Sequence, residues 1–304
     1  MRTILLTGGA GFIGSCVLRR LLADGFSVIV LIRSRTNLYR INDLLDQVVV
    51  YDIEQKKLSD IFLENHIYAI LHLACKYGRA GEIMPVVQSN VIFGLELLEL
   101  AVKGNVKIFI NSDTFYNVPG KKYEGRLAPY ILTKRQFLDW LLFYSQKIAI
   151  INLKLQHVYG SGDAEDKFLP WLVSQFFCGG GEVKLTGGEQ QRDFVAVNDV
   201  ASAFSFCLTH FAGVDKGFRT FKVGSDQPTT LKEFVLLAYD LYKKENCSEE
   251  VFLDFGAVPY AVDEIMFLDE ITPSLTSIGW HPRSTAEVTL RELISEWSKH
   301  RCLS

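Results

Sequence analysis

Short apolar runs alternate with longer stretches of helical periodicity along the first half of the chain. Runs rich in Val, Ile and Leu are typical of buried strands, and apolar residues three or four positions apart are typical of helices. The predicted strands are 4–6, 27–32, 47–51, 69–74, 107–111 and 148–153, and the predicted helices include 16–24, 90–103, 129–146 and 286–299. This alternation predicts an α/β fold, a doubly wound parallel sheet with helices on both faces.

A glycine-rich turn follows the first predicted strand. Residues 7 to 15 read Thr-Gly-Gly-Ala-Gly-Phe-Ile-Gly-Ser, with glycines at 8, 11 and 14. Glycine permits the tight turn, the approach of backbone to a pyrophosphate, and close packing of helix on strand. The amides at the helix start then face the phosphates. Because the turn joins a strand to a helix, it predicts a Rossmann-type dinucleotide site.

The pattern of the sequence changes after about residue 160, where the predicted elements are shorter and glycines are frequent between them. We expect a dinucleotide-binding domain over 1–160 and a smaller substrate-binding region over 161–189 and 225–304. Residues 190–224 are expected to return to the first domain, as a strand at 193–197, a helix from 198 and a strand at 219–223.

Composition narrows the class of partner. The chain has 304 residues, of which 48% are hydrophobic, and a net charge of -3. This charge gives no reason to expect nucleic acid, and no segment has the ~20 apolar residues of a membrane helix. The six cysteines have no metal-ligand spacing, which favours free thiols in a reducing cytoplasm and predicts no metal site. We therefore expect a small-molecule substrate.

The end of the second strand bears on which cofactor is bound. An acidic residue there accepts hydrogen bonds from the ribose 2′-hydroxyl of NAD, whereas a basic residue accommodates the 2′-phosphate of NADP. Here the strand ends at Ile32 and continues with Arg33-Ser-Arg35, a segment without a carboxylate. The sequence therefore favours NADPH. Asp52, after the third strand, is expected to meet the adenine amino group or to be an ordinary turn aspartate.

Tyr130 and Lys134 form the second chemical motif. Their spacing of four places the phenol and the ammonium on one face of a helix. A free tyrosine titrates near ~10, and a neighbouring cation lowers the pKa, so Tyr130 is expected to exchange protons with a carbonyl or an alcohol. Ser112, at the end of the preceding strand, is placed to donate a hydrogen bond to the substrate oxygen.

With these motifs the chain resembles the extended short-chain dehydrogenase/reductase family, the nucleotide-sugar epimerases, dehydratases and reductases. The matching segments lie in the family's order: Thr7 to Gly14, Leu71 to Ala74, Asn90, Ser112, Tyr130 with Lys134, His157 to Gly160, and Arg192 to Val195. The resemblance implies that Ser112, Tyr130 and Lys134 are catalytic. It also implies that Arg192 contacts the diphosphate of the substrate, although an ion pair with Asp193 is an alternative.

Within this family, the activity depends on residues around the shared catalytic set. Dehydratases have Thr-Asp-Glu where this chain has Ser112-Asp-Thr114, so the expected base for dehydration is absent. The arginines after the second strand favour a reductase over an epimerase. The segments Lys76–Gly78, Pro129–Arg135 and Glu264–Phe267 resemble the family's abequose and paratose synthases.

The resemblance implies NADPH-dependent reduction of CDP-4-keto-3,6-dideoxy-D-glucose at C4, with Tyr130 as the proton donor. It also suggests dideoxysugar supply for a bacterial surface polysaccharide, the O-antigen of lipopolysaccharide. The alternatives are a 4-ketoreductase or 4-epimerase acting on a dTDP-, UDP- or GDP-sugar, and an NADP-binding sensor without turnover.

These inferences define sets of site residues. The residues expected to bind the cofactor are Gly8, Gly11, Phe12, Ile13, Gly14, Arg33, Ser34, Arg35, Asp52, Ile53, Leu73, Ala74, Asn90, Tyr130, Lys134 and His157. The residues expected to bind the substrate are Lys76, Tyr77, Ser112, Asp113, Thr114, Lys167, Phe168 and Arg192.

The helices at 90–103 and 130–146 carry apolar residues around much of their circumference, more than one buried face needs. Family dimers resemble a four-helix bundle made from these two helices, so a C2 homodimer is expected. Coverage of the same residues by the chain itself is the competing explanation.

Overall fold

A computed structural model describes residues 2–78, 83–118, 120–177, 181–245, 250–268 and 271–301. The chain divides into two units. The first comprises residues 1–155, 200–223 and 271–280, and the second comprises 156–199, 224–270 and 281–304.

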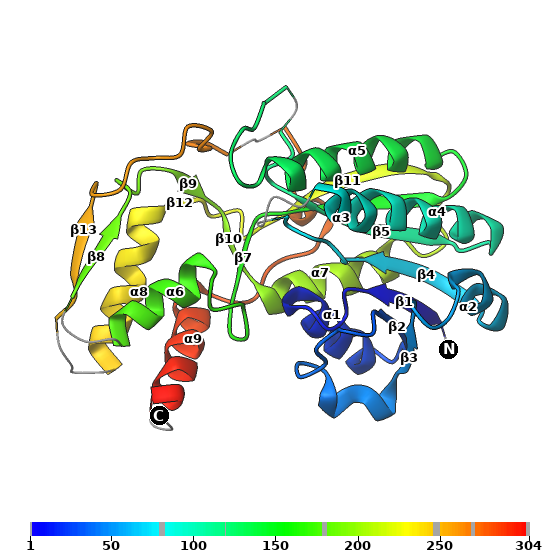
Figure 1. The fold of residues 1–304 in the computed structure, drawn as a ribbon, viewed down its shortest axis with the longest axis horizontal. Helices are drawn as coiled ribbons and strands as arrows, with labels where there is room; N and C mark the ends of the chain where they lie inside the picture. Colours follow the sequence, from blue (N-terminus) through cyan, green and yellow to red (C-terminus); the bar gives the residue numbers. More distant parts are fainter. Residues whose placement is uncertain are drawn as a thin grey trace. The chain divides into compact units, whose positions relative to one another are not determined.

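The first unit is built on a seven-stranded parallel sheet of order β11-β6-β5-β4-β1-β2-β3 (Figure 1). Its strands are β1 (Thr3–Thr7), β2 (Ser27–Ile32), β3 (Val49–Asp52), β4 (Ile67–His72), β5 (Ile108–Thr114), β6 (Ala149–Leu155) and β11 (Gly217–Val223). The strand order reverses between β1 and β4, and ligands of such sheets bind at the carboxyl ends of the strands at this point. The predicted doubly wound α/β fold is confirmed.

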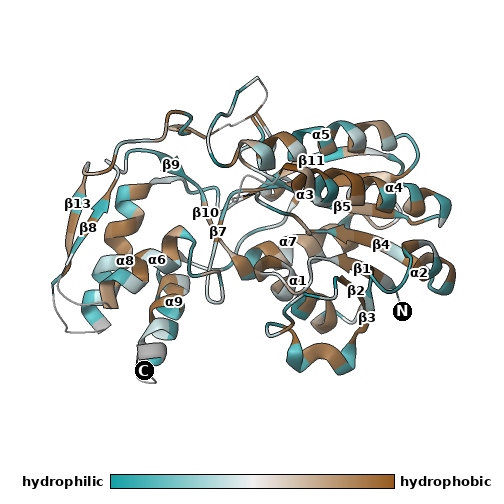
Figure 2. Ribbon diagram, viewed as in Figure 1, coloured by the Kyte–Doolittle hydropathy of each residue, from teal (hydrophilic) through white to brown (hydrophobic). Residues whose placement is uncertain are grey.

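Helices cover both faces of this sheet. They are α1 (Phe12–Ala23), α2 (Leu58–Glu64), α4 (Phe93–Lys103), α5 (Ala128–Tyr144) and α7 (Val197–His210), with short 3-10 turns η1 (Asn42–Gln47) and η3 (Leu275–Ile278). Figure 1 shows α4 and α5 on one side of the sheet and α1 and α7 on the other. Brown marks hydrophobic residues in Figure 2, and it is common along the strands of the sheet, which are buried between these layers. Helices α4 and α5 pack closely at Gly94, where an added Cβ would lie 2.4 Å from the Phe137 ring.

The helix predicted at 90–103 is longer in the structure and irregular. It begins with α3 (Ile83–Val87), widens into the π-helical turn η2 (Gln88–Ile92) and continues as α4. By length and composition alone the stretch Ile83–Lys103 could cross a membrane, but core helices of water-soluble proteins meet the same criterion. Leu97, Leu98 and Ala101 of this stretch are buried in the core of the first unit.

The second unit carries three two-stranded sheets, β10–β7, β12–β9 and β13–β8. Its elements are β7 (His157–Tyr159), α6 (Phe168–Phe177), β8 (Glu182–Leu185), β9 (Gln191–Arg192), β10 (Phe194–Ala196), β12 (Thr229–Thr230), α8 (Leu231–Glu245), β13 (Phe252–Phe255) and α9 (Ala286–Arg301). A stack of Phe194 on Phe234, with ring centres 3.6 Å apart, lies in its core.

Two expectations for the division of the chain are wrong. Residues 271–280, expected in the substrate-binding region, belong to the first unit, because Pro273 and Ser274 pair with Lys222 of β11. The strand predicted at 193–197 was expected to return to the first domain, but β10 pairs with β7, and residues 190–199 belong to the second unit. The reason is local packing, since Phe194 is buried in the aromatic core of that unit. The helix α7 and the strand β11 that follow do supply the first unit, as expected.

Candidate active site

The glycine turn lies between β1 and α1, and its close contacts explain the three glycines. Gly8 has a φ of +71°, and a Cβ on it would lie 2.8 Å from the Ala74 amide nitrogen. A Cβ on Gly14 would lie 2.0 Å from the Gly8 carbonyl oxygen. The N-cap of α1 is Gly11, which has no side chain to cap the first-turn amides. The turn therefore leaves these amides free for a phosphate and lies against the backbone of Leu73 and Ala74.

Hydrogen bonds join the ends of three strands beneath this turn. The Thr7 hydroxyl accepts from the Leu73 and Ala74 amides at 3.2 and 3.1 Å and lies 2.9 Å from Nδ1 of His72. The Ser112 hydroxyl donates to the His72 carbonyl at 3.1 Å. Because the Thr7 oxygen already accepts two amides, its own proton is available to the histidine nitrogen, which must then be an unprotonated acceptor.

Burial has the same consequence for His72. The ring is almost completely enclosed, and its burial, together with the charge of Lys134, lowers the pKa of His72 to about 3. His72 is therefore neutral at physiological pH. The motif Leu71 to Ala74 in the sequence did not predict this neutral state or the hydrogen bond to Thr7.

The predicted catalytic residues lie close together at the end of β5. Helix α5 carries Tyr130 and Lys134, and the Lys134 ammonium donates to the Ser112 main-chain carbonyl at 2.7 Å. The same ammonium lies 5.9 Å from the centre of the Tyr130 ring. The Tyr130 phenol hydrogen-bonds to the Thr114 side chain, two residues beyond Ser112. All three predicted catalytic residues are buried.

The pKa of Tyr130 differs from the sequence-based expectation. Lys134 was expected to lower it, but burial raises the pKa of this phenol well above its usual value, and Tyr77, Cys75 and Asp113 raise it further. The Thr114 hydrogen bond lowers it in part. The phenol is therefore protonated at neutral pH, the state required of a proton donor.

The predicted substrate contact of Asp113 does not fit its placement. The carboxylate is only 5% exposed. It accepts from Asn152 at 3.0 Å, from the Thr114 amide at 2.8 Å, and from Asn117 at 3.3 and 3.4 Å. Burial raises the pKa of Asp113, and these hydrogen bonds oppose the rise. Asp113 thus holds the end of β5 in place, because its oxygens are already used by the protein.

Asn90, predicted to bind the cofactor, lies in the π-helical turn and holds the loop after β4. Its Oδ1 accepts from the Lys76 amide at 2.7 Å, and its Nδ2 donates to the Lys76 carbonyl at 2.9 Å. The same Nδ2 donates to the Thr133 hydroxyl at 3.0 Å. Asn90 therefore joins the loop at 73–78 to helix α5.

The loop at residues 33–35, which was expected to determine whether NAD or NADP binds, lies close to two carboxylates from another segment. Arg33, Ser34 and Arg35 are exposed. The Ser34 hydroxyl donates to Asp52 at 2.6 Å, and the Ser34 amide donates to Glu54 at 3.1 Å. Asp52 was expected near the cofactor but Glu54 was not, and pairing of β2 with β3 brings both carboxylates to this end of the sheet.

The second unit holds the remaining predicted substrate residues. Arg192 is 4% exposed, pairs with Glu264, and donates to the carbonyls of Ile265 and Gln191 at 2.5 and 2.6 Å. Burial, with the charge of Arg192, holds the pKa of His157 well below its usual value, so this histidine is neutral. From the sequence, Glu264 was expected only as part of a segment that resembles the family, and its ion pair with Arg192 was not predicted.

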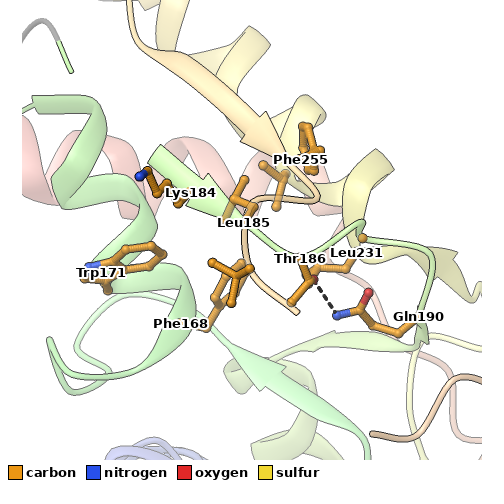
Figure 3. A pocket seen from close by; sticks show the side chains of 11 residues that line it. Phe168, Trp171, Lys184, Leu185, Thr186, Gln190, Leu231 and Phe255 are labelled. Atoms are coloured by element: carbon orange, nitrogen blue, oxygen red, sulfur yellow. Dashed lines mark hydrogen bonds between the residues drawn. The ribbon is translucent and has the colours of Figure 1, made fainter. Parts of the chain in front are cut away.

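A cavity of about 240 Å³ lies within the second unit (Figure 3). Phe168 and Trp171 of α6 face Leu185 and Thr186 at the end of β8, and the Gln190 amide donates to the Thr186 hydroxyl at 3.2 Å. The lining is mostly apolar, and it includes Lys184, Gly188, Leu231, Val235, Phe255 and Val258. Of the predicted substrate residues, Phe168 lies in this cavity.

A Rossmann-type sheet with a glycine turn at its switch point, and a tyrosine and a lysine beside it, defines a dinucleotide-dependent oxidoreductase. Comparison with known proteins agrees: the model of the NAD dependent epimerase/dehydratase family matches residues 4–224. The chain belongs to this family, and it is an oxidoreductase acting on CH-OH groups.

Several relatives match along the whole chain. CDP-abequose synthase of Salmonella typhimurium is 30% identical, covering 96% of this chain and 97% of the relative. CDP-abequose synthase of Salmonella muenchen is 32% identical, covering 97% of both. Among solved structures, UDP-glucose 4-epimerase of Thermotoga maritima with UDP-glucose has a TM-score of 0.77 and 25% identity, and covers 98% of this chain and 99% of that chain.

The neutral state of His72 predicts a pH dependence of stability. Its pKa of about 3 lies below the ordinary value of 6.5, so the unfolded chain binds the extra proton and stability falls as pH drops below 6.5. We expect about 2 kcal/mol of the free energy of unfolding to be lost at pH 5 through this residue. The measurement is urea unfolding at pH 8, 6.5 and 5, for the protein and for His72→Gln, which should lose less. Equal losses in both proteins would contradict the prediction.

Proposed function

We propose that the protein is an NADPH-dependent 4-ketoreductase that reduces CDP-4-keto-3,6-dideoxy-D-glucose to CDP-abequose or CDP-paratose. The observation that carries the proposal is the buried phenol of Tyr130, which hydrogen-bonds to Thr114 and whose ring centre lies 5.9 Å from the Lys134 ammonium. Similarity to two CDP-abequose synthases along nearly the whole chain supports the CDP-sugar.

The described residues fit a dinucleotide cofactor. Gly8 and Gly14 let the turn lie close against the Leu73–Ala74 backbone and against the start of α1, and the first amides of α1 are uncapped and can bind a pyrophosphate. We propose that Phe12 and Ile13 of this turn, Ile53 and His157 also contact the cofactor, with Ile53 beside the adenine and His157 at the nicotinamide end. When bound, NADPH supplies a hydride to C4 of the keto sugar.

The residues of the chain do the remaining chemistry. Tyr130 donates its proton to O4 as negative charge develops there. The Lys134 ammonium stabilises the phenolate that remains and holds the nicotinamide ribose. The Ser112 hydroxyl turns from the His72 carbonyl to steady O4. Thr114, at the position of the dehydratase base, has no carboxylate, and the Asp113 carboxylate is buried, so dehydration lacks its base.

We propose that the second unit binds the nucleotide. The apolar cavity beside Phe168 suits a flat base, since aromatic and aliphatic side chains line it. Arg192 is proposed to contact the diphosphate and Lys167 to lie near it, as the resemblance implies. In that case the diphosphate competes with Glu264 for the Arg192 guanidinium.

A second candidate function is a 4-epimerase or 4-ketoreductase acting on another nucleotide sugar. The observation that favours the epimerase is the pair of carboxylates, Asp52 and Glu54, bonded to Ser34. Acidic groups in this place suit the ribose hydroxyls of NAD, which epimerases retain.

Tyr130→Phe is the test of the reductase. We expect NADPH oxidation with CDP-4-keto-3,6-dideoxy-D-glucose to fall about a hundredfold to ten-thousandfold, because the proton donor is lost. The variant should still bind NADPH, which NADPH fluorescence measures, because the rest of the expected cofactor site is intact. The measurement is absorbance at 340 nm, with NMR of the product to name the sugar. Interconversion of a plain nucleotide sugar without net NADPH oxidation would instead establish the epimerase.

Arg33→Ala is the test of cofactor choice. One charge-assisted hydrogen bond is worth roughly 1.5 to 3 kcal/mol, so the preference of kcat/KM for NADPH over NADH should fall about tenfold to a hundredfold. Glu54→Gln should shift the preference the other way, because a carboxylate repels the 2′-phosphate. Arg20→Ala, on α1, is the charge-matched control. A preference for NADH in the unaltered protein would contradict the NADPH assignment.

We also propose a cytoplasmic homodimer that pairs α4 and α5 with their copies. Several residues expected there, Leu97, Phe137, Leu141 and Tyr144, are covered by the chain itself. Other apolar residues remain exposed on α5 and on the α3–η2 segment that precedes α4: Ile83, Met84, Ile92, Leu132, Trp140, Leu142 and Phe143. The described cysteines, Cys16, Cys75 and Cys207, are free thiols, and Cys178, Cys247 and Cys302 lie outside the described residues.

Phe143→Glu should convert this dimer to a monomer, because a charge would be buried at the apolar face. Leu63→Glu is the control, because Leu63 of α2 is an exposed apolar residue outside these helices, and it should leave the mass unchanged. Sedimentation equilibrium at micromolar concentration measures both. A monomeric unaltered protein would exclude the dimer.

A further inference from the structure

Tyr77 lies against the Tyr130 ring. The two ring centres are 4.7 Å apart, with the planes inclined at 33°. Tyr77 is 36% exposed, whereas Tyr130 is 7% exposed. Tyr77 is therefore the outer ring of the pair, and it covers part of the Tyr130 ring that would otherwise meet solvent.

The loop that carries Tyr77 is held in place from both sides. Asn90 bonds to the amide and to the carbonyl of Lys76, the residue immediately before Tyr77. Asn90 also donates to the Thr133 hydroxyl, which bonds back to the carbonyls of Pro129 and Tyr130. One buried amide therefore couples the position of Tyr77 to the helical turn that bears Tyr130.

The π-helical turn explains how Asn90 reaches both partners. Gln88–Ile92 is wider than an α-helical turn, and such turns occur frequently at functional sites. After Tyr77, Gly78 adopts a φ of +70°, a conformation in which another residue would be strained. The Tyr77 ring thus has a defined place over Tyr130.

The other groups that face the Tyr130 phenol come from three elements. Cys75 lies in the same loop as Tyr77, Asp113 and Thr114 lie on β5, and Lys134 lies one turn further along α5. The largest effect on the pKa of the phenol is burial, and the next is the charge that Tyr77 carries when its own phenol is ionised. Tyr77 and Cys75 are the exposed members of this group.

We propose that Tyr77 is a positioning residue that holds the Tyr130 ring and keeps water from its phenol. The inference rests on the proposed function for the role of Tyr130 as donor. It assigns Tyr77 a task distinct from contact with the sugar, because the partner of its ring is the tyrosine itself.

The direct test measures the titration of Tyr130 and needs no substrate. The protein is labelled with [ζ-13C]tyrosine, and the Tyr130 signal is the one missing from Tyr130→Phe. Tyr77→Ala admits water to the phenol, so its pKa should fall by roughly one unit. Tyr77→Phe keeps the ring and removes only the phenol with its charge, so it should lower the pKa less than Tyr77→Ala does. An unchanged titration in Tyr77→Ala, or equal shifts in both variants, would overturn the proposal.

Kinetics separate this role from a sugar contact. A reductase that uses protonated Tyr130 loses rate as pH rises through the pKa of the phenol, so Tyr77→Ala should move the alkaline limb of kcat down by roughly one unit. A rise in KM with an unmoved limb would assign Tyr77 to the sugar and overturn the proposal. A shifted NMR titration without NADPH oxidation by any variant would support the positioning role and refute the proposed function.

Discussion

The hydrogen bond from the Lys134 ammonium to the Ser112 carbonyl is the interaction on which the rest of the site depends. It ties helix α5 to the end of β5 at 2.7 Å. A buried cation is costly unless polar groups surround it, so this contact restricts where α5 can lie. Tyr130, one turn earlier on the same helix, is thereby held near Thr114 and under Tyr77. The close packing of Gly94 on Phe137 supports the same placement.

Enclosure of this site determines the protonation state of its groups. Burial raises the pKa of the Tyr130 phenol, lowers the pKa of His72 and raises the pKa of Asp113. In each case burial favours the neutral form of the group. Hydrogen bonds then either oppose this shift of the pKa or are made by the neutral form itself. The Asp113 carboxylate is compensated by Asn152, Asn117 and the Thr114 amide, whereas His72 stays neutral and accepts from Thr7. The site is thus arranged around a protonated tyrosine.

Parts of this arrangement were predictable because their causes are local. The spacing of Gly8, Gly11 and Gly14 after an apolar run predicted the turn, and the spacing of Tyr130 and Lys134 predicted a shared helix face. The contacts of Asp113, Asn90 and Glu54 were not predictable, because their partners come from other elements. The strand β10 was assigned to the wrong unit for the same reason, since an apolar run does not specify its pairing partner.

By itself, the sequence determined the order of strands and helices, the doubly wound class of the sheet, and the residue types of the catalytic set. These depend on periodicity and on spacings within single elements. Only the tertiary structure decided that burial raises the pKa of the Tyr130 phenol, that Asn90 holds the Tyr77 loop, and that Asp52 of β3 and the nearby Glu54 reach Ser34. The physical reason is that burial and hydrogen-bond partners arise from residues far apart in the chain, and the sign of a pKa shift follows from both.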